Sequence, residues 1–372
     1  MPNAPTPPLV ASFVGLTIMV VLGGFVAAWA YTLLQLWRRQ PLIPWQPRRH
    51  VPWGLIDLAI IIGLFFVAIL VSREVLGFLL QGKIDPAQLT LADNRLIVIA
   101  DGAAKLAIMG VAIPAIILRT GVGWHDWGIY WREAARDVVI GVVAFCMLAP
   151  IVYAIQALMV QFQPYEHPLM KMMEKTPDLT LFWILVFSAS IMAPLSEEWF
   201  FRVVLQGWLE KVFSNRGSTS DLVLGDASVP AIAGSTETAV LAGDLIPRGL
   251  SSPGEFAATY PNPYQPPAAL VGEDMAYAWP LPQAKEAIEY RWPQSLLRHF
   301  LPIVMSALIF ALMHLSHGLA WIPLTFLALG LGYIYQRTHS ILPGIVVHFL
   351  FNSLSMAVFW VQLFEADKLP GK

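Results

Sequence analysis

Charged residues are scarce in this sequence. Asp, Glu, Lys and Arg make up 13% of its 372 residues, whereas hydrophobic residues make up 57%. A soluble globular domain carries about 25% charged residues. The chain therefore has too little charge to cover a water-exposed surface, which excludes a soluble globule and indicates an integral membrane protein.

Cysteine and clustered basic residues are also nearly absent. The single cysteine, Cys146, lies in an apolar segment, which excludes a disulfide within the chain and a cysteine-rich metal site. The net charge is -2 and no basic stripe appears, so binding of nucleic acid has no support. The N-terminal MPNAPTPPLV lacks the positive charge of a secretory signal, and the apolar run after it is too long for one. We interpret that run as a retained transmembrane helix.

Long apolar runs are what the chain has instead. A helix needs about 20 apolar residues to cross the hydrocarbon layer, and we predict an all-α fold, a polytopic membrane helix bundle of about eight transmembrane helices. The fifth run is unusually long and could be one tilted helix or a crossing followed by an interfacial helix. The predicted crossings are residues 10–36, 53–72, 96–118, 137–160, 180–213, 300–318, 320–336 and 342–364.

Residues 214–299 differ in composition from the rest of the chain. They hold ten of its 29 prolines and nine acidic residues against five Lys and Arg. Because such a segment cannot cross a bilayer and shows no sustained helical period before about Gln283, we predict a mostly disordered acidic insert. The stretch PQAKEAIEYRW at its end could form a surface helix. We predict about four N-terminal transmembrane helices in residues 1–179 and a catalytic membrane core in residues 180–213 and 300–364, which the insert divides.

Basic residues gather in the loops on one side of the predicted membrane. The positive-inside rule assigns such loops to the cytoplasm, which leaves the N-terminus outside and the insert cytoplasmic. The insert could bind a cytoplasmic partner there. The residues behind this prediction are Arg38, Arg39, Arg48, Arg49, Arg119, Arg132, Arg136 and Arg337.

Charged side chains inside the crossings need a partner or a purpose, because a charge at mid-membrane costs about 3 kcal/mol or more. Asp101 and Lys105 are four residues apart and can pair on one helix face, which favours a structural ion pair. Asp57 lies near the start of the second crossing, where we expect it to be solvated. We place none of these three in a functional site.

The fifth crossing carries Glu197, Glu198 and Arg202 in the stretch APLSEEWFFRVVLQ. Adjacent helical positions point about 100° apart, so one arginine pairs with only one of the two glutamates. The spacing of four residues favours Glu198 as that partner. Glu197 then has no cation close in sequence and can accept a proton, as a general base must. The structural alternative is that both glutamates reach the headgroups or a partner helix.

Histidines mark the later crossings. His314 and His317 lie near the end of the sixth crossing, while His348 and Asn352 project from one face of the eighth. A lone membrane histidine more often bonds a neighbouring helix. Together with Glu197, however, these groups could hydrolyse an amide. A carboxylate and an imidazole can deprotonate a water, while a second imidazole and a carboxamide can stabilise an oxyanion.

The same residues allow a metal-dependent alternative. Glu197, His314 and His348 could bind a divalent metal such as zinc and leave one position for water. Spacing alone does not separate the two versions. The chain contains neither the H-E-x-x-H motif of zinc proteases nor the G-x-S-x-G elbow of serine hydrolases.

Three motifs occur in a fixed order along the membrane helices. They are Glu197-Glu198-x-x-x-Arg202, Phe310-x-x-x-His314 and His348-x-x-x-Asn352. In this order they resemble the CAAX protease and bacteriocin-processing family, which includes the type II CAAX prenyl endopeptidases. The resemblance covers about residues 180–364. The sequence departs from the family pattern in the length of the insert and in Val203, where a small residue is common.

The resemblance implies an eight-helix bundle with a conical cavity, open to the cytoplasm, in which a peptide bond is cut. Glu197 and His314 would position the attacking water, and His348 and Asn352 would form the oxyanion hole. Glu198 and Arg202 would support the site. Both metalloproteases and metal-independent glutamate proteases have been described in this family.

The implied substrate is a membrane-associated or lipid-linked peptide or protein, cut at an inner or plasma membrane of bacterial type. Two other classes of protein remain open. The chain could be a non-catalytic membrane scaffold or immunity protein, in which the polar residues hold helices together. It could also be a proton-coupled transporter that uses the same Glu and His residues as a relay, although it lacks the paired broken helices of such transporters.

Overall fold

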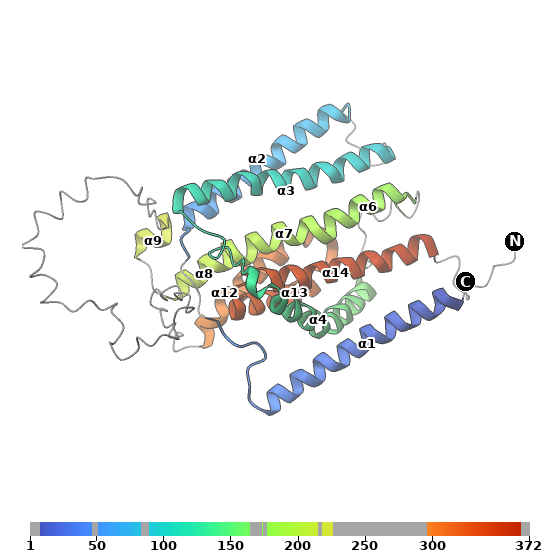
Figure 1. The fold of residues 1–372 in the computed structure, drawn as a ribbon. Coiled ribbons are helices and arrows are strands. Elements are labelled where there is room, and N and C mark those ends of the chain that lie inside the picture. The colour runs from blue at the N-terminus through green and yellow to red at the C-terminus, as the bar shows by residue number, and fades with distance from the viewer. Residues whose placement is uncertain are drawn as a thin grey trace, which may run out of the picture. The chain divides into compact units, whose positions relative to one another are not determined.

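The computed structural model describes residues 8–46, 51–82, 89–163, 173, 177–214, 218–225 and 296–365. By internal contacts the chain divides into two units, residues 1–228 with 290–372, and residues 229–289. The second unit lies outside the described residues. The described part of the first unit is helical and contains no strand (Figure 1). This confirms the predicted all-α fold.

The helices of the described residues follow the predicted apolar runs, because in lipid a helix satisfies its backbone hydrogen bonds internally. Six helices are long and apolar enough to cross a membrane, and Leu22–Trp37 and His299–Leu312 are shorter apolar helices. The chain is therefore a multi-pass membrane protein, and about eight crossings are reached only if both shorter helices also cross. The α-helices are α1 (Pro8–Trp37), α2 (Leu55–Leu79), α3 (Leu91–Thr120), α4 (Ala134–Phe162), α6 (Leu179–Phe187), α7 (Ala193–Glu198), α8 (Gly207–Phe213), α9 (Thr219–Leu224), α12 (Leu296–Leu312), α13 (Trp321–Thr338) and α14 (Leu342–Trp360).

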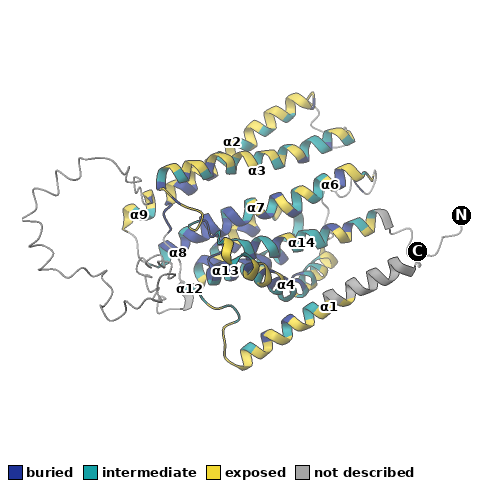
Figure 2. Ribbon diagram, in the orientation of Figure 1, coloured by how far each residue is buried: buried dark blue, intermediate teal, exposed yellow. Residues whose placement is uncertain are grey.

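Burial separates the inner helices from the outer ones. Buried residues are frequent in α8, α13 and α14, whereas most residues of α2 and most of the described residues of α1 are exposed (Figure 2). α14 packs on α4 and α12 packs on α13, while α1 packs on α4 and α2 packs on α3. Val203, Ala307 and Phe310 are almost completely covered in the core between the inner helices. Exposed apolar side chains on α1, α2 and α3 are suited to lipid.

The fifth predicted crossing is one continuous helical run from Leu179 to Phe213. Two π-helical segments interrupt its α-helical geometry, η3 (Ser188–Met192) and η4 (Trp199–Gln206), and α7 lies between them. Such π segments are rare and frequent at functional sites. Here they lie on both sides of the helix that carries Glu197 and Glu198.

The sixth predicted crossing ends earlier than expected. We predicted residues 300–318, but α12 ends at Leu312, and His314 precedes a 3₁₀ segment, η7 (Leu315–Ala320). Gly318 within η7 has φ +64°, a left-handed conformation that favours glycine. His314 therefore lies in a turn between α12 and α13 and not in a helix.

Loops predicted to share the cytoplasmic side contact one another at one end of the bundle. The backbone N–H of Gln46, in the first loop, donates to the carbonyl of Arg337 at 2.9 Å. The Lys211 ammonium, at the end of the fifth crossing, donates to the carbonyl of Val51 at 2.9 Å. These contacts join loops that are far apart in sequence. Arg48 and Arg49 lie outside the described residues.

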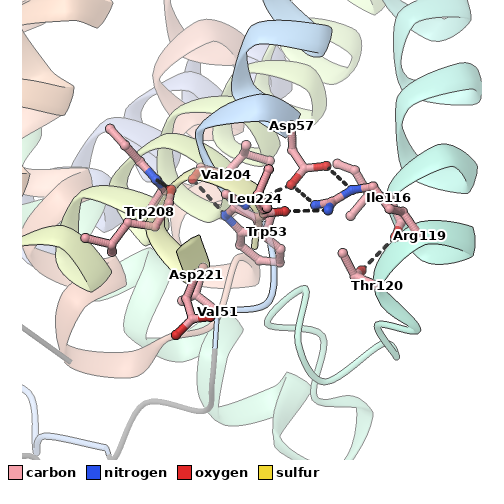
Figure 3. A network of polar contacts seen from close by, with 12 residues as sticks. Val51, Trp53, Asp57, Ile116, Arg119, Thr120, Val204, Trp208, Asp221 and Leu224 are labelled. Atoms are coloured by element: carbon pink, nitrogen blue, oxygen red, sulfur yellow. Dashed lines mark hydrogen bonds and ion pairs between the residues drawn. The ribbon is translucent and has the colours of Figure 1, made fainter. Parts of the chain in front are cut away.

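Asp57 departs from the prediction that it is solvated. Its side chain is only 2% exposed and forms an ion pair with Arg119 of α3. It also accepts a hydrogen bond from the backbone N–H of Gly54 at 2.8 Å and so caps α2. The expectation was wrong because Arg119, 62 positions away in sequence, covers the carboxylate (Figure 3).

The start of the predicted insert is ordered. We predicted a mostly disordered insert over residues 214–299, and within its described part α9 packs against α2 and α8. The indole N–H of Trp208 donates to the carbonyl of Leu222 at 2.9 Å. Arg119 donates to the carbonyl of Leu224 (Figure 3). Ser218 and Asp221 form a capping box that starts α9. Residues 218–225 are therefore an ordered start to the insert that we predicted to be mostly disordered, and residues 226–295, including the stretch PQAKEAIEYRW, lie outside the described residues.

Candidate active site

Glu198 and Arg202 form the ion pair predicted from their spacing. Arg202 Nε lies 3.2 Å from Glu198 Oε2, and the two side chains are 1% and 0% exposed. The arginine is in η4 and the glutamate ends α7, so one turn of the distorted helix supplies both charges. A pair this deeply buried is stable only when each partner neutralises the other.

His348 of α14 lies between the two glutamates. Its Nδ1 is 3.2 Å from Glu198 Oε1, and its Nε2 is 3.8 Å from Glu197 Oε2. A ring nitrogen that donates to Glu198 fixes the ring plane, as carboxylates commonly do for functional histidines. The prediction that Glu197 has no cationic neighbour holds for the sequence around it. In three dimensions His348 is its neighbour.

Glycine at position 344 makes room for this arrangement. A Cβ atom at Gly344 would lie 2.7 Å from Glu198 Oε2, which is closer than a Cβ atom approaches a non-bonded atom in real proteins. Gly344 is in the first turn of α14, one turn before His348. The close approach of α14 to α7 therefore depends on the missing side chain.

His314 contacts Phe310 and lies near His317. Its Nδ1 is 2.9 Å from the carbonyl oxygen of Phe310, and its ring centroid is 4.7 Å from that of Phe310. The rings of His314 and His317 are 5.8 Å apart, and His317 interacts electrostatically with both His314 and Glu197. The described residues contain no hydrogen bond between His314 and Glu197.

Asn352 is tied to the other π segment. Its Nδ2 donates to the carbonyl of Ala189 in η3 at 2.7 Å. A carboxamide has two N–H donors, so this bond uses one of them. Asn352 is one turn further along α14 than His348, and the two are on the same face as predicted.

Ser306 of α12 makes a polar contact with Arg202 that we did not predict from the sequence. Its hydroxyl donates to the carbonyl of Phe201 at 2.9 Å and accepts from Arg202 Nη1 at 3.2 Å, and its side chain is fully buried. The only sequence signal was its position four residues before Phe310, which places it on the same helix face.

A three-ligand metal site does not form from the side chains as they lie. Among the described residues no group of three His, Cys, Asp or Glu converges as metal ligands would. The predicted set of Glu197, His314 and His348 is thus connected only through the contact between Glu197 and His348. Zinc sites hold their ligands at about 2 Å from one ion, so these residues would have to rearrange to bind one.

The fold and this site together define a multi-pass helical membrane protein with a buried group of acids, imidazole and guanidinium. The family model described as "Type II CAAX prenyl endopeptidase Rce1-like" matches residues 179–235 and 268–354. All three motifs lie in the matched segments, and the match confirms the resemblance to the CAAX protease and bacteriocin-processing family. It supports a protease as the type of enzyme. No curated protein and no solved structure matched the chain.

Proposed function

We propose that the protein is an intramembrane endopeptidase that hydrolyses a peptide bond in a membrane-associated or lipid-linked substrate. One observation carries the proposal. Glu197 and His348 face each other across 3.8 Å, and the buried Glu198–Arg202 pair holds His348 from the other side. A separation above about 3.5 Å between two polar groups suits a bridging water. The family match supports the same type of reaction.

In the proposed mechanism Glu197 is the general base. Its carboxylate takes a proton from water as the water oxygen bonds to the carbonyl carbon of the scissile peptide, and His314 helps to orient that water. The carbonyl oxygen becomes an oxyanion. The C–N bond then breaks, and Glu197 returns the proton to the leaving amine. Atoms and charge balance without a further reactant.

His348 and Asn352 are proposed to stabilise the oxyanion. In its protonated form His348 donates Nδ1–H to Glu198 and keeps Nε2–H for the oxyanion, while Asn352 supplies its second N–H. The two glutamates, Arg202 and protonated His348 then sum to zero charge. A neutral group is the arrangement that burial in lipid favours, because isolated charges are costly there.

Loss of the base is the direct test of this mechanism. Purified protein is given a library of prenylated and amphipathic peptides, and cleavage is followed by mass spectrometry. Glu197→Gln should lower the rate by about 10²- to 10⁴-fold, the usual contribution of a general base. Asp101→Asn is the matched control, since it changes another acid in an apolar helix and should leave the rate unchanged. Full activity of Glu197→Gln would contradict the mechanism and favour a scaffold role.

Metal dependence is tested separately. Because no three-ligand group is present in the described residues, we propose that Glu197 and His314 activate the water without a metal ion. Activity should persist in a chelator that removes zinc, and elemental analysis of the active preparation should find less than one metal ion per chain. Stoichiometric zinc whose removal abolishes cleavage would overturn the metal-free version.

We propose that the loops at the end that carries α9 face the cytoplasm. The basic loops predicted to lie inside contact one another at this end. The exposed indoles of Trp37, Trp124 and Trp131 also fit the aromatic belt at a membrane interface. The insert would then be cytoplasmic and accessible to a cytoplasmic partner. Labelling of single cysteines introduced at positions 124 and 85 with an impermeant reagent in intact cells tests this, and labelling of position 124 alone would reverse the orientation.

A further inference from the structure

A continuous chain of polar contacts runs from Ser306 to Glu197. Ser306 accepts from Arg202, Arg202 binds Glu198, and His348 links Glu198 to Glu197, with heavy-atom distances of 3.2, 3.2, 3.2 and 3.8 Å in that order. The first four of these side chains are at least 95% buried. Because the first three contacts are shielded from solvent by this burial, each of these four groups sets the position of the next.

Ser306 joins this chain to the backbone of η4. Its hydroxyl donates to the carbonyl of Phe201, the residue directly before Arg202. The same oxygen accepts from Arg202. One side chain of α12 therefore holds both the backbone and the guanidinium at the point where the helix is π-helical.

Donors from other elements bind backbone carbonyls in both π segments. Asn352 binds Ala189 in η3, while Ser306 binds Phe201 and the indole of Trp53 binds Val204 in η4 at 3.0 Å. A π turn has poorer backbone hydrogen-bond geometry than an α turn and is usually retained for function. These side-chain donors stabilise the distorted stretches on both sides of Glu197 and Glu198.

The aromatic ring of Phe310 also contacts the guanidinium of Arg202. The guanidinium of Arg202 lies 5.6 Å from the centroid of the Phe310 ring, a cation–π distance. The same ring is 4.7 Å from His314 and 6.2 Å from His348. Ser306 and Phe310 lie one turn apart on α12, so this helix positions Arg202 through a hydroxyl and an aromatic face.

We propose that Ser306 is a positioning residue of the active site, which orients His348 through Arg202 and Glu198. This inference rests on the proposed function. Ser306 does not contact the reacting atoms. Its hydroxyl fixes Arg202, Arg202 fixes the carboxylate of Glu198, and that carboxylate sets the ring plane of His348 that faces Glu197 and the scissile carbonyl.

Ser306→Ala tests the inference with the purified full chain and a cleaved peptide. Removal of a hydrogen bond to a charged group should lower kcat about tenfold, while KM stays unchanged because the substrate does not contact Ser306. Ser306→Thr, which keeps the hydroxyl, should recover most of that loss. Ser196→Ala is the matched control, since within the described part of the chain the Ser196 hydroxyl bonds to the carbonyls of Met192 and Ala193 in its own helix run and to no other group.

A double-mutant cycle distinguishes positioning from general stability. In an Arg202→Lys background Ser306→Ala should lower kcat by less than twofold, because the contact that it removes is already lost. Equal effects in both backgrounds, or a wild-type kcat for Ser306→Ala, would overturn the inference. If Ser306→Ala does not fold, Ser306→Cys keeps nearly the same volume with a weaker donor, and a wild-type kcat for it has the same meaning.

The two failures give different results. If Glu197→Gln abolishes cleavage and Ser306→Ala has no effect, only the inference about Ser306 is wrong. If Glu197→Gln keeps full activity, the proposed mechanism itself is wrong. Imidazole ¹⁵N NMR of the Glu197→Gln protein adds a readout without activity, since Ser306→Ala should shift the His348 signal there and Ser196→Ala should not.

Discussion

Two ion pairs with the same spacing differ in almost everything else. Asp101 and Lys105 on α3 are in contact at 2.8 Å, with side chains 57% and 26% exposed. Glu198 and Arg202 are in contact at 3.2 Å, with side chains 0% and 1% exposed. Among the described residues the outer pair has no further polar partner, whereas the inner pair continues to Ser306 and His348. A spacing of four residues thus predicts contact, and the packing around it determines whether the contact serves a site.

The largest difference is expected when each cation is replaced by methionine. Arg202→Met leaves Glu198 buried without its partner, which should cost about 3–5 kcal/mol of stability, together with activity. Lys105→Met should cost less, because the Asp101 carboxylate is exposed and is not enclosed by other side chains of the protein. Thermal unfolding of both variants in detergent measures the contrast. Similar losses would show that the outer pair is also buried, against a neighbour or in lipid.

A smaller effect is expected when the space that Gly344 leaves for the Glu198 side chain is filled. Gly344→Ala should displace the Glu198 carboxylate and lower kcat by about 100-fold, the effect of a misplacement of about 1 Å. The helix itself should lose no stability, since alanine is the better helix former by about 1 kcal/mol. Gly102→Ala on α3 is the matched control, because its Cβ would meet no atom within 4 Å. Unchanged kcat for Gly344→Ala would show that the carboxylate position is not critical.

The smallest expected effect is a pH dependence of stability that arises at the N-terminal end of α6. The Leu181 backbone N–H and then Arg95 hold the pKa of Asp178, which caps α6, below its usual value. A lowered pKa in the folded state stabilises the fold above the ordinary carboxyl pKa, and this contribution is lost as pH falls through the folded-state pKa.

Acid unfolding measures this contribution. The melting temperature of the wild-type protein should fall more steeply in this acidic range than that of Asp178→Asn, because asparagine keeps the cap without titrating. Equal slopes for the two proteins would contradict the assignment. Asp178→Asn should not alter kcat, since Asp178 lies outside the polar chain around Glu198.

The helical fold was predictable because lipid leaves the backbone few choices. Long apolar runs must be helical in a bilayer, and the predicted segments agree with α2, α3 and α4 within several residues. Ends and distortions were less predictable. Nothing in the composition of residues 179–213 signals two π segments, and the end of α12 was missed although Ser316 and Gly318, which favour turns, follow it closely.

The sequence predicts candidate members of the site more readily than the contacts among them. The spacing of Glu198 and Arg202 predicted their pair, and the three motifs identified Glu197, His314 and His348. Asp57 shows the limit of such reasoning, because its partner Arg119 comes from another helix and changes it from a solvated acid into a buried one. The spacing of Ser306 from Phe310, four residues, was too weak a signal to predict its contact with Arg202.

The order and spacing of residues along the chain determined the helical membrane class, the pairing of Glu198 with Arg202 and the set of candidate residues. These are local properties, since a helix brings residues four apart together without help from the rest of the chain. Only the packing of α14 and α12 against the fifth crossing decided that His348 bridges both glutamates and that Ser306 holds Arg202. Contacts between helices depend on close fit, such as the space left by Gly344, and that fit arises only when the whole bundle forms.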